Sequence, residues 1–312
     1  MVEPPRIAVF APDPLLSVAV ETRPGGGDEL HLHPAGQGVW AARMAAELGG
    51  HPVLCGFSGG ETGAVVEGLL GTVELRLVPC AQPTGAYVVD RRTERTLIAQ
   101  AYPEPRTRHE VDELISVTCA TALAADVLVI CNPYPAETIP ADAYAQLVGD
   151  AHDAGTKVLV DLSTPRLDAA LEGRPDLVKI NDWELAEYVR APVDGPALRE
   201  AAERVRERGA HTVVITRGAA PAVAFSPNGA IEVAPPAFER GHREGCGDAM
   251  MGAMAVALAR GDALSTALRL GAAAGAANFL RRGLGSASAD VVENLVERVA
   301  VRPYVDRPLV ST

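Results

Sequence analysis

The chain has 312 residues, 48% of them hydrophobic, with a formal net charge of −12 and a pI near 5.1. This length and composition allow one α/β domain with a sizeable core. The acidic balance argues against proteins that hold nucleic acid or anionic membrane by bulk attraction.

The cysteines and the N-terminus both bear on the compartment. The five cysteines are scattered, odd in number and without a C-x-x-C pair, which favours a reducing environment. The first residues, MVEPPRIAVF, place a Glu and two prolines where a signal peptide needs a basic start and an apolar run. No segment reaches the roughly 18 uninterrupted apolar residues of a membrane span. We therefore expect a soluble, cytoplasmic protein whose residues 1–312 form a single domain.

Short apolar runs alternate with Ala- and Leu-rich segments of helical periodicity along most of the chain. This pattern is typical of βα units and a largely parallel sheet. The expected core strands are residues 7–10, 52–57, 126–131, 157–162, 177–180 and 212–216. The expected helices, with apolar residues at three- and four-residue spacing, are residues 38–48, 62–70, 141–154, 196–208, 248–260 and 263–280.

Two stretches, residues 15–33 and 73–100, interrupt this alternation. In the second stretch, V-E-L-R-L-V and G-A-Y-V-V-D have the composition of strands, with no helix between them. We expect both stretches to be antiparallel hairpins that join in a small β-sheet, placed to act as a lid. Two ordinary edge hairpins are the alternative.

The strongest local motif is E-G-C-G-D at residues 244–248, which opens the helical run A-M-M-G-A-M-A-V-A-L-A. Glycines ahead of a helix let the backbone approach a ligand, and the free N–H groups of the first turn favour a phosphate there. A carboxylate beside that anion suggests a base that accepts a proton from an attacking hydroxyl. The alternative is that Asp248 only stabilises the first turn of the helix.

The G-C-G-D motif resembles the G-A-G-D signature of PfkB carbohydrate kinases, the ribokinase-like family. Four more segments resemble this family in the same order along the chain: A-G-Q-G at 35–38, G-F-S-G-G-E-T-G at 56–63, D-L-V-K-I-N-D-W-E at 176–184, and V-I-T-R-G-A at 214–219. The resemblance spans roughly residues 5–300. It is strongest to the 1-phosphofructokinase and tagatose-6-phosphate kinase branch.

The resemblance implies a ribokinase-like three-layer α/β/α sandwich with a mostly parallel central sheet and a small β-sheet lid. It implies an ATP-dependent kinase that transfers the γ-phosphoryl group to a hydroxyl of a small sugar, phosphosugar or related acceptor. Asp248 would be the general base. The backbone of Gly245, Cys246 and Gly247 would form the anion hole for the moving phosphoryl group.

The resemblance also assigns a nucleotide side. Thr216, Arg217 and Gly218, at the end of an expected strand, would meet the nucleotide phosphates. Lys179 would reach the same phosphates, unless it is a surface lysine at a strand end. Asn278 lies on a helix of small residues where the family's adenine pocket is placed, although a polar residue facing solvent is the alternative.

Two groups of residues are candidate metal ligands. Asn181 and Glu184 share a face if a helix starts at Asn181, so both could organise a hydrated Mg²⁺ between ATP phosphates. The same spacing is that of an N-cap with its capping-box Glu, and both interpretations can hold together. His31 and His33 alternate on an expected strand, but the sequence offers no third ligand, so we interpret them as lid surface.

The acceptor side departs from the family. In Asp13-Pro-Leu-Leu-Ser17, a serine replaces an Asp that grips sugar hydroxyls, although Asp13 lies near. Trp40 stands where a sugar-contacting Asn is expected, and C-N-P-Y-P at 131–135 replaces a serine-rich segment. We expect Trp40 and Trp183 to be packing residues. The expected substrate-side residues are Asp13, Gly36, Gln37 and Gly38.

These departures leave the acceptor open. A nucleoside kinase, or a catalytically weak ligand-binding protein on the kinase fold, is the alternative to a carbohydrate kinase. A dehydrogenase is disfavoured because no G-x-G-x-x-G follows the first strand. The resemblance is also compatible with a homodimer through the β-lid.

Overall fold

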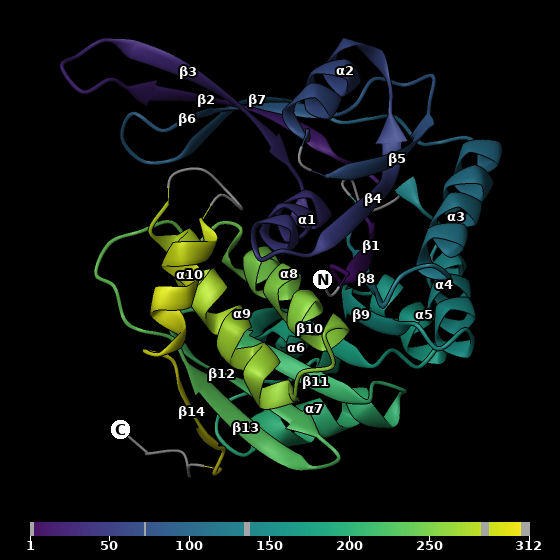
Figure 1. Cartoon of the computed structure of the whole chain (residues 1–312), viewed down its shortest axis with the longest axis vertical. Coiled ribbons are helices and arrows are strands. Elements are labelled where there is room, and N and C mark those ends of the chain that lie inside the picture. The colour runs from purple at the N-terminus through teal and green to yellow at the C-terminus, as the bar shows by residue number, and fades with distance from the viewer. Residues whose placement is uncertain (1–2, 72, 134–137, 282–286, 307–312) are drawn as a thin grey trace.

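The computed structural model describes residues 3–71, 73–133, 138–281 and 287–306. A ten-stranded sheet forms the centre of the molecule, in the order β14-β13-β12-β11-β10-β9-β8-β1-β4-β5 (Figure 1). The strands from β11 to β5 run parallel, and the others extend one edge with antiparallel pairing. The strands are β1 Arg6–Phe10, β4 His51–Ser58, β5 Glu74–Pro79, β8 Val127–Cys131, β9 Lys157–Asp161, β10 Leu177–Asn181, β11 Thr212–Arg217, β12 Ala220–Ser226, β13 Gly229–Ala234 and β14 Ala300–Pro303.

Helices cover both faces of this sheet, so the molecule has three layers (Figure 1). Strand β1 shows why, since Ile7 and Val9 enter one buried cluster with α1, α8, α9 and α10, while Ala8 and Phe10 enter another with α3 to α7. A strand buried on both faces is expected to be apolar, as residues 7–10 of β1 are. The helices are α1 Gln37–Glu47, α2 Gly60–Leu69, α3 Arg108–Ala122, α4 Asp142–Asp153, α5 Arg166–Glu172, α6 Asp182–Val189, α7 Ala197–Glu207, α8 Cys246–Ala259, α9 Leu264–Phe279 and α10 Ala289–Val296.

A separate four-stranded sheet has the order β3-β2-β6-β7. Its strands are β2 Leu15–Thr22, β3 Asp28–Ala35, β6 Ala86–Asp90 and β7 Thr96–Ala101. The two interrupting stretches therefore contribute to one sheet. The prediction for residues 73–100 is wrong in one part, because β5 pairs in parallel with β4 at the edge of the large sheet and not in a hairpin with β6. Only β6 and β7 form the second hairpin.

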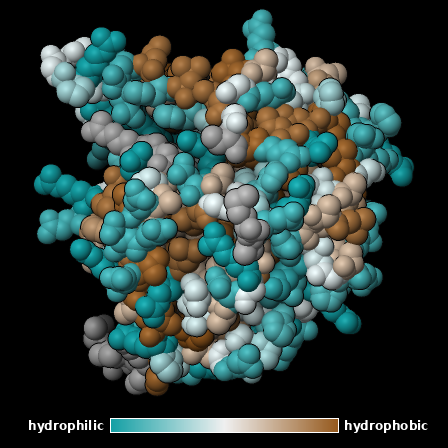
Figure 2. Space-filling view, viewed as in Figure 1, coloured by the Kyte–Doolittle hydropathy of each residue, from teal (hydrophilic) through white to brown (hydrophobic). Residues whose placement is uncertain are grey.

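The small sheet has two different faces. On β3, Leu30 and Leu32 are exposed, whereas the alternate residues His31 and His33 are partly covered. Figure 2 shows hydrophobic side chains gathered over this part of the molecule. On β2, the residues on the same face as His31 and His33, among them Ser17, are buried. The polar face of the small sheet is thus turned inward and an apolar face is turned to solvent.

The predicted fold class is confirmed, and each expected strand and helix matches an element of the structure. Helices α3, α5 and α10 and strands β12 to β14 were not among the expected elements, and α6 was considered only as a possible helix starting at Asn181. Helix α3 begins with a capping box in which Thr107 accepts a hydrogen bond from the Glu110 N–H. Among the helices of the described ranges, none is both long and apolar enough to cross a membrane.

Candidate active site

Helix α8 begins at the predicted phosphate-binding loop. Its N-cap, Gly245, has φ 75°, a left-handed conformation that favours glycine. A Cβ atom on Gly247 would lie 3.1 Å from the Lys179 ammonium, so the missing side chain lets this cation reach the helix start. The Cys246 N–H donates to the Arg243 carbonyl over 3.3 Å. This N–H, one of the three predicted for the anion hole, thus already has a partner within the loop. Burial raises the pKa of the Cys246 thiol to about 11, so the thiol adds no negative charge there.

Asp248 lies in the first turn of α8 and is buried, with 8% of its surface exposed. Its pKa is raised to about 7, first by burial and then by the nearby Asp161, against the lowering effect of Lys179. A carboxyl group with this pKa can accept a proton near neutral pH and release it again. The electrostatics of the site therefore suit a general base.

Lys179 is buried in the middle of β10, and its Nζ lies 2.7 Å from Asp161 Oδ2. Burial lowers the pKa of Lys179, but Asp161 and Asp248 outweigh that effect, so the net shift is upward. The alternative that Lys179 is a surface lysine is wrong. Asp161 was not predicted, although an Asp that ends a buried strand at the carboxyl edge of a parallel sheet is a recognisable signal.

Asn181 and Glu184 form the capping box of α6. Asn181 Oδ1 accepts a hydrogen bond of 2.8 Å from the Glu184 N–H, and Glu184 Oε2 accepts one of 3.1 Å from the Asn181 N–H. Burial raises the pKa of Glu184. The capping interpretation is confirmed, and the second Glu184 oxygen is not used by this box. Trp183, between them, is 63% exposed, so its prediction as a packing residue is wrong.

The residues predicted to meet the nucleotide phosphates lie at the end of β11 and directly after it. Thr216 and Arg217 end β11, but the Arg217 Nε donates to the Pro221 carbonyl over 2.7 Å and its Nη2 lies 3.7 Å from Glu232. The Arg217 guanidinium thus contacts the neighbouring strands β12 and β13. Gly218 follows with φ 59°, and a Cβ there would lie 3.9 Å from Arg243.

Asn278 is fully buried in α9, so the alternative of a solvent-facing side chain is wrong. Its Nδ2 donates to the Glu244 carbonyl over 2.9 Å. This bond joins α9 to the loop that precedes α8. Asn278 therefore anchors the loop of the predicted anion hole to α9.

Asp13, the predicted acceptor-side carboxylate, is paired inside the protein. Its Oδ1 lies 3.4 Å from Arg106 Nη2, and both side chains are 1% exposed. The Arg106 guanidinium also lies 4.9 Å from the ring centre of Phe57. Asp13 thus has a structural partner that the sequence did not predict, 93 positions away along the chain.

The start of α1 is shaped by close packing. A Cβ atom on Gly38 would lie 2.4 Å from the Ala11 Cβ, so only glycine fits, and Gly36 has φ 114°. Gln37 Oε1 accepts a hydrogen bond of 3.1 Å from the Asn132 N–H. Trp40 is buried in the core, as predicted.

A polar group that the sequence did not reveal lies at the ends of β8 and β9. Asn132 Oδ1 accepts hydrogen bonds from the Ser163 N–H over 3.1 Å and from Arg166 Nε over 3.2 Å. Arg166 Nη2 donates to Ser163 Oγ over 3.0 Å. Because Gln37 accepts a hydrogen bond from the Asn132 backbone, this group lies next to the start of α1.

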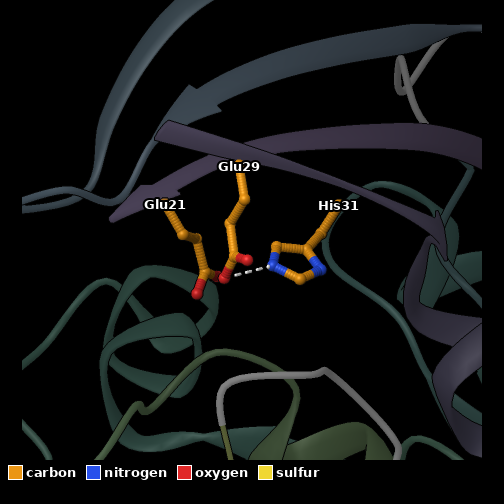
Figure 3. A group of neighbouring side chains, drawn as sticks. All are labelled: Glu21, Glu29 and His31. Atoms are coloured by element: carbon orange, nitrogen blue, oxygen red, sulfur yellow. Dashed lines mark ion pairs between the residues drawn. The ribbon is translucent and has the colours of Figure 1, made fainter. Parts of the chain in front are cut away.

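On the inner face of the small sheet, Glu21, Glu29 and His31 lie together (Figure 3). One ligand atom from each lies within 4.8 Å of the others, and His31 Nε2 is 3.0 Å from Glu29 Oε1. Glu21 and Glu29 are directly opposed on β2 and β3, which brings two carboxylates to the histidine. The sequence-based expectation that no third ligand accompanies the histidines is therefore wrong for His31, beside which Glu21 and Glu29 lie.

Three comparisons with known proteins agree. The model of the "pfkB family carbohydrate kinase" matches residues 17–290. The ATP-dependent 6-phosphofructokinase isozyme 2 of Escherichia coli is 29% identical over 85% of this chain and 87% of its own length. A 1-phosphofructokinase of Rhodobacter capsulatus is 30% identical over 77% of this chain and 80% of its own.

Solved structures give the same result. A crystal structure of phosphofructokinase-2 from E. coli in complex with potassium has a TM-score of 0.82 and 28% identity, and the match covers 94% of this chain and 98% of that one. An Arabidopsis thaliana ribokinase structure, at 20% identity and a TM-score of 0.74, shares the fold. The chain belongs to the pfkB family and is an ATP-dependent carbohydrate kinase.

Proposed function

We propose that the kinase transfers the γ-phosphoryl group of ATP to a hydroxyl of a small sugar or phosphosugar at the start of α8. The observation that carries this proposal is the position of Asp248, a buried carboxylate with a pKa raised to about 7 in the first turn of that helix. Burial of the Asp248 carboxylate beside Asp161 is costly for stability, which favours a functional role for Asp248.

In this mechanism Asp248 accepts the proton of the acceptor hydroxyl as its oxygen attacks the γ-phosphorus. The bond from that phosphorus to the bridging oxygen breaks, and ADP leaves. The first turn of α8, with Gly245 and Gly247, favours the negative charge of the moving group. Lys179 lies against Gly247 and contributes a positive charge there. Asp161 holds that lysine in place.

Asn181 and Glu184 fit a site for Mg²⁺, because they offer the hard oxygen ligands that this ion prefers. The capping box occupies one Glu184 oxygen and leaves the other for a bound water or the ion. Mg²⁺ would neutralise phosphate charge on the nucleotide. The nucleotide phosphates would lie near Thr216, Arg217 and Gly218.

For the acceptor, we propose the polar residues that line the carboxyl edge between α1 and β9, which include Gln37, Asn132 and Arg166. Asp13, tied to Arg106, acts by shaping this wall and not by gripping sugar hydroxyls. The relatives' names support acceptors of the phosphosugar type: they include 1-phosphofructokinase and D-tagatose-1-phosphate kinase.

The small sheet would act as a lid over the acceptor, since water would otherwise compete as the nucleophile. Its outer face carries Leu30 and Leu32 of β3, which are 64% and 46% exposed. Exposed apolar residues of this kind would suit a homodimer through the lid. A cytoplasmic location completes the proposal, since that compartment supplies ATP.

The test of the nucleotide assignment is thermal unfolding with ligands. ATP with Mg²⁺ should raise the melting temperature, because a ligand that binds only the native state stabilises it, and NAD should not. A shift with NAD and none with ATP would overturn the proposal.

A further inference from the structure

Two ion pairs join the small sheet to the loop that precedes α8. Arg91 Nη2 lies 3.1 Å from Glu244 Oε2, and Arg95 Nη2 lies 3.1 Å from Glu244 Oε1. Arg91 directly follows β6 and Arg95 directly precedes β7, so both arginines come from the turn of one hairpin. They contact different oxygens of one carboxylate.

Both sides of this contact are fixed in place. The Arg91 N–H donates to the Val20 carbonyl over 2.8 Å, which anchors the arginine to β2. The Glu244 carbonyl accepts the Asn278 side chain from α9. The Arg91 side chain is 10% exposed and Glu244 27%, so solvent screens this pair less than an open surface pair. Arg95 is 46% exposed and contributes less.

Glu244 directly precedes Gly245, the N-cap of the proposed anion hole. An uncompensated carboxylate at this position would repel an incoming phosphate. With the lid arginines in contact, that negative charge is neutralised. The lid therefore has an electrostatic connection to the site as well as a steric one.

We propose that Arg91, Arg95 and Glu244 form a lid latch, in which the two arginines are positioning residues that hold the small sheet over the phosphoryl-transfer loop. The inference rests on the proposed function only in taking this loop as the place of transfer. Closure of the lid neutralises Glu244, so lid closure and binding of the triphosphate favour each other. A closed latch also keeps water away from the reacting phosphorus.

The first test measures hydrogen exchange at residues 86–101 in the ligand-free protein, with Arg91→Gln, Glu244→Gln and the double variant. Arg91→Gln should speed exchange about tenfold, the size expected when one partly buried charged hydrogen bond is lost, and Glu244→Gln at least as much, because it also loses the more exposed Arg95 contact. The double variant should add little to Glu244→Gln, because that variant has already lost the Arg91 contact. Arg91→Lys, which keeps the charge, should stay near the wild type.

Arg92→Gln is the matched control. Arg92 lies in the same turn and loses the same charge, but its partners Asp90 and Asp28, at 2.7 and 3.1 Å, belong to the small sheet itself. In Arg92→Gln, the rate of hydrogen exchange at residues 86–101 should stay well below the rate in Arg91→Gln. Equal acceleration by Arg91→Gln and Arg92→Gln, or additive effects in the double variant, would overturn the latch.

The second test is the ratio of ADP formed to acceptor phosphorylated. Arg91→Gln should raise this ratio several-fold, because an open lid admits water as a competing nucleophile, whereas Arg92→Gln should not. Faster exchange with an unchanged ratio would overturn the latch's role in excluding water. The exchange measurement needs no turnover, so it separates failure of the latch from failure of the proposed kinase site.

Discussion

Asp248→Asn should make the protein more stable and almost inactive. The side chain keeps its volume, but the buried charge and the base are both removed. The pKa of Asp248 is raised from 3.8 to about 7. At about 1.4 kcal/mol per pKa unit, keeping this carboxylate ionised in the folded protein costs on the order of 4 kcal/mol. Its removal should recover a large part of that free energy above neutral pH.

The pH dependence of this gain has a definite sign. A raised folded-state pKa means that the native protein holds its proton more tightly than the unfolded chain does. Stability from the protonated form is complete below the unfolded pKa of 3.8 and is lost as pH rises through the folded value of about 7. The advantage of Asp248→Asn over the wild type should therefore be small near pH 4, grow up to pH 7 and level off above it.

Two assays check the variant. Urea unfolding at a series of pH values gives the difference in free energy of unfolding. Steady-state turnover should fall by about 10²- to 10⁴-fold, the usual contribution of a general base, while ATP affinity changes little. Near-normal turnover would refute the base assignment, and Asp248 would then be a helix-end residue. Equal stability of the two proteins at all pH values would refute the electrostatic account.

Three further predictions concern the surroundings of the site. Glu184→Gln should raise the Mg²⁺ concentration needed for half-maximal turnover, measured by metal titration, while a comparable change at exposed Glu187 should not; an equal requirement in both would argue against the metal role. Asp13→Asn should lower the free energy of unfolding by about 3–5 kcal/mol without any ligand, because it leaves Arg106 buried and unpaired; unchanged stability would instead return Asp13 to the acceptor. Gly38→Ala should destabilise the fold, seen as a lower melting temperature, because its Cβ would meet Ala11 at 2.4 Å; an unaltered melting temperature would contradict the packing argument.

Local patterns predicted the loop and the helix around Asp248. The glycines before α8 and the small residues within it lie in one continuous segment, so the loop, the helix and Asp248 follow from neighbouring residues. The capping box of α6 is equally local. Both patterns depend on backbone conformation over a few positions, and sequence spacing is then a direct guide to structure.

Long-range contacts were beyond such reasoning. Glu244 and Arg91 lie 153 positions apart, and no pattern within either segment indicates the other. The predicted pairing of β5 was wrong for a related reason, because the residues of β5 suit a strand in either sheet. In the structure β5 pairs with the edge of β4, and only tertiary packing brings these two strands together. Trp183 was expected to be a packing residue, yet α6 presents it to solvent.

The central claim is that this chain moves a phosphoryl group from ATP to an acceptor hydroxyl. Its most direct test incubates the protein and Mg-ATP with a panel of sugars, phosphosugars and nucleosides, and measures ADP release together with the mass of the product. We expect at least one sugar or phosphosugar to gain one phosphoryl group for each ADP released. Binding of ATP without a phosphorylated product from any member of the panel would contradict it.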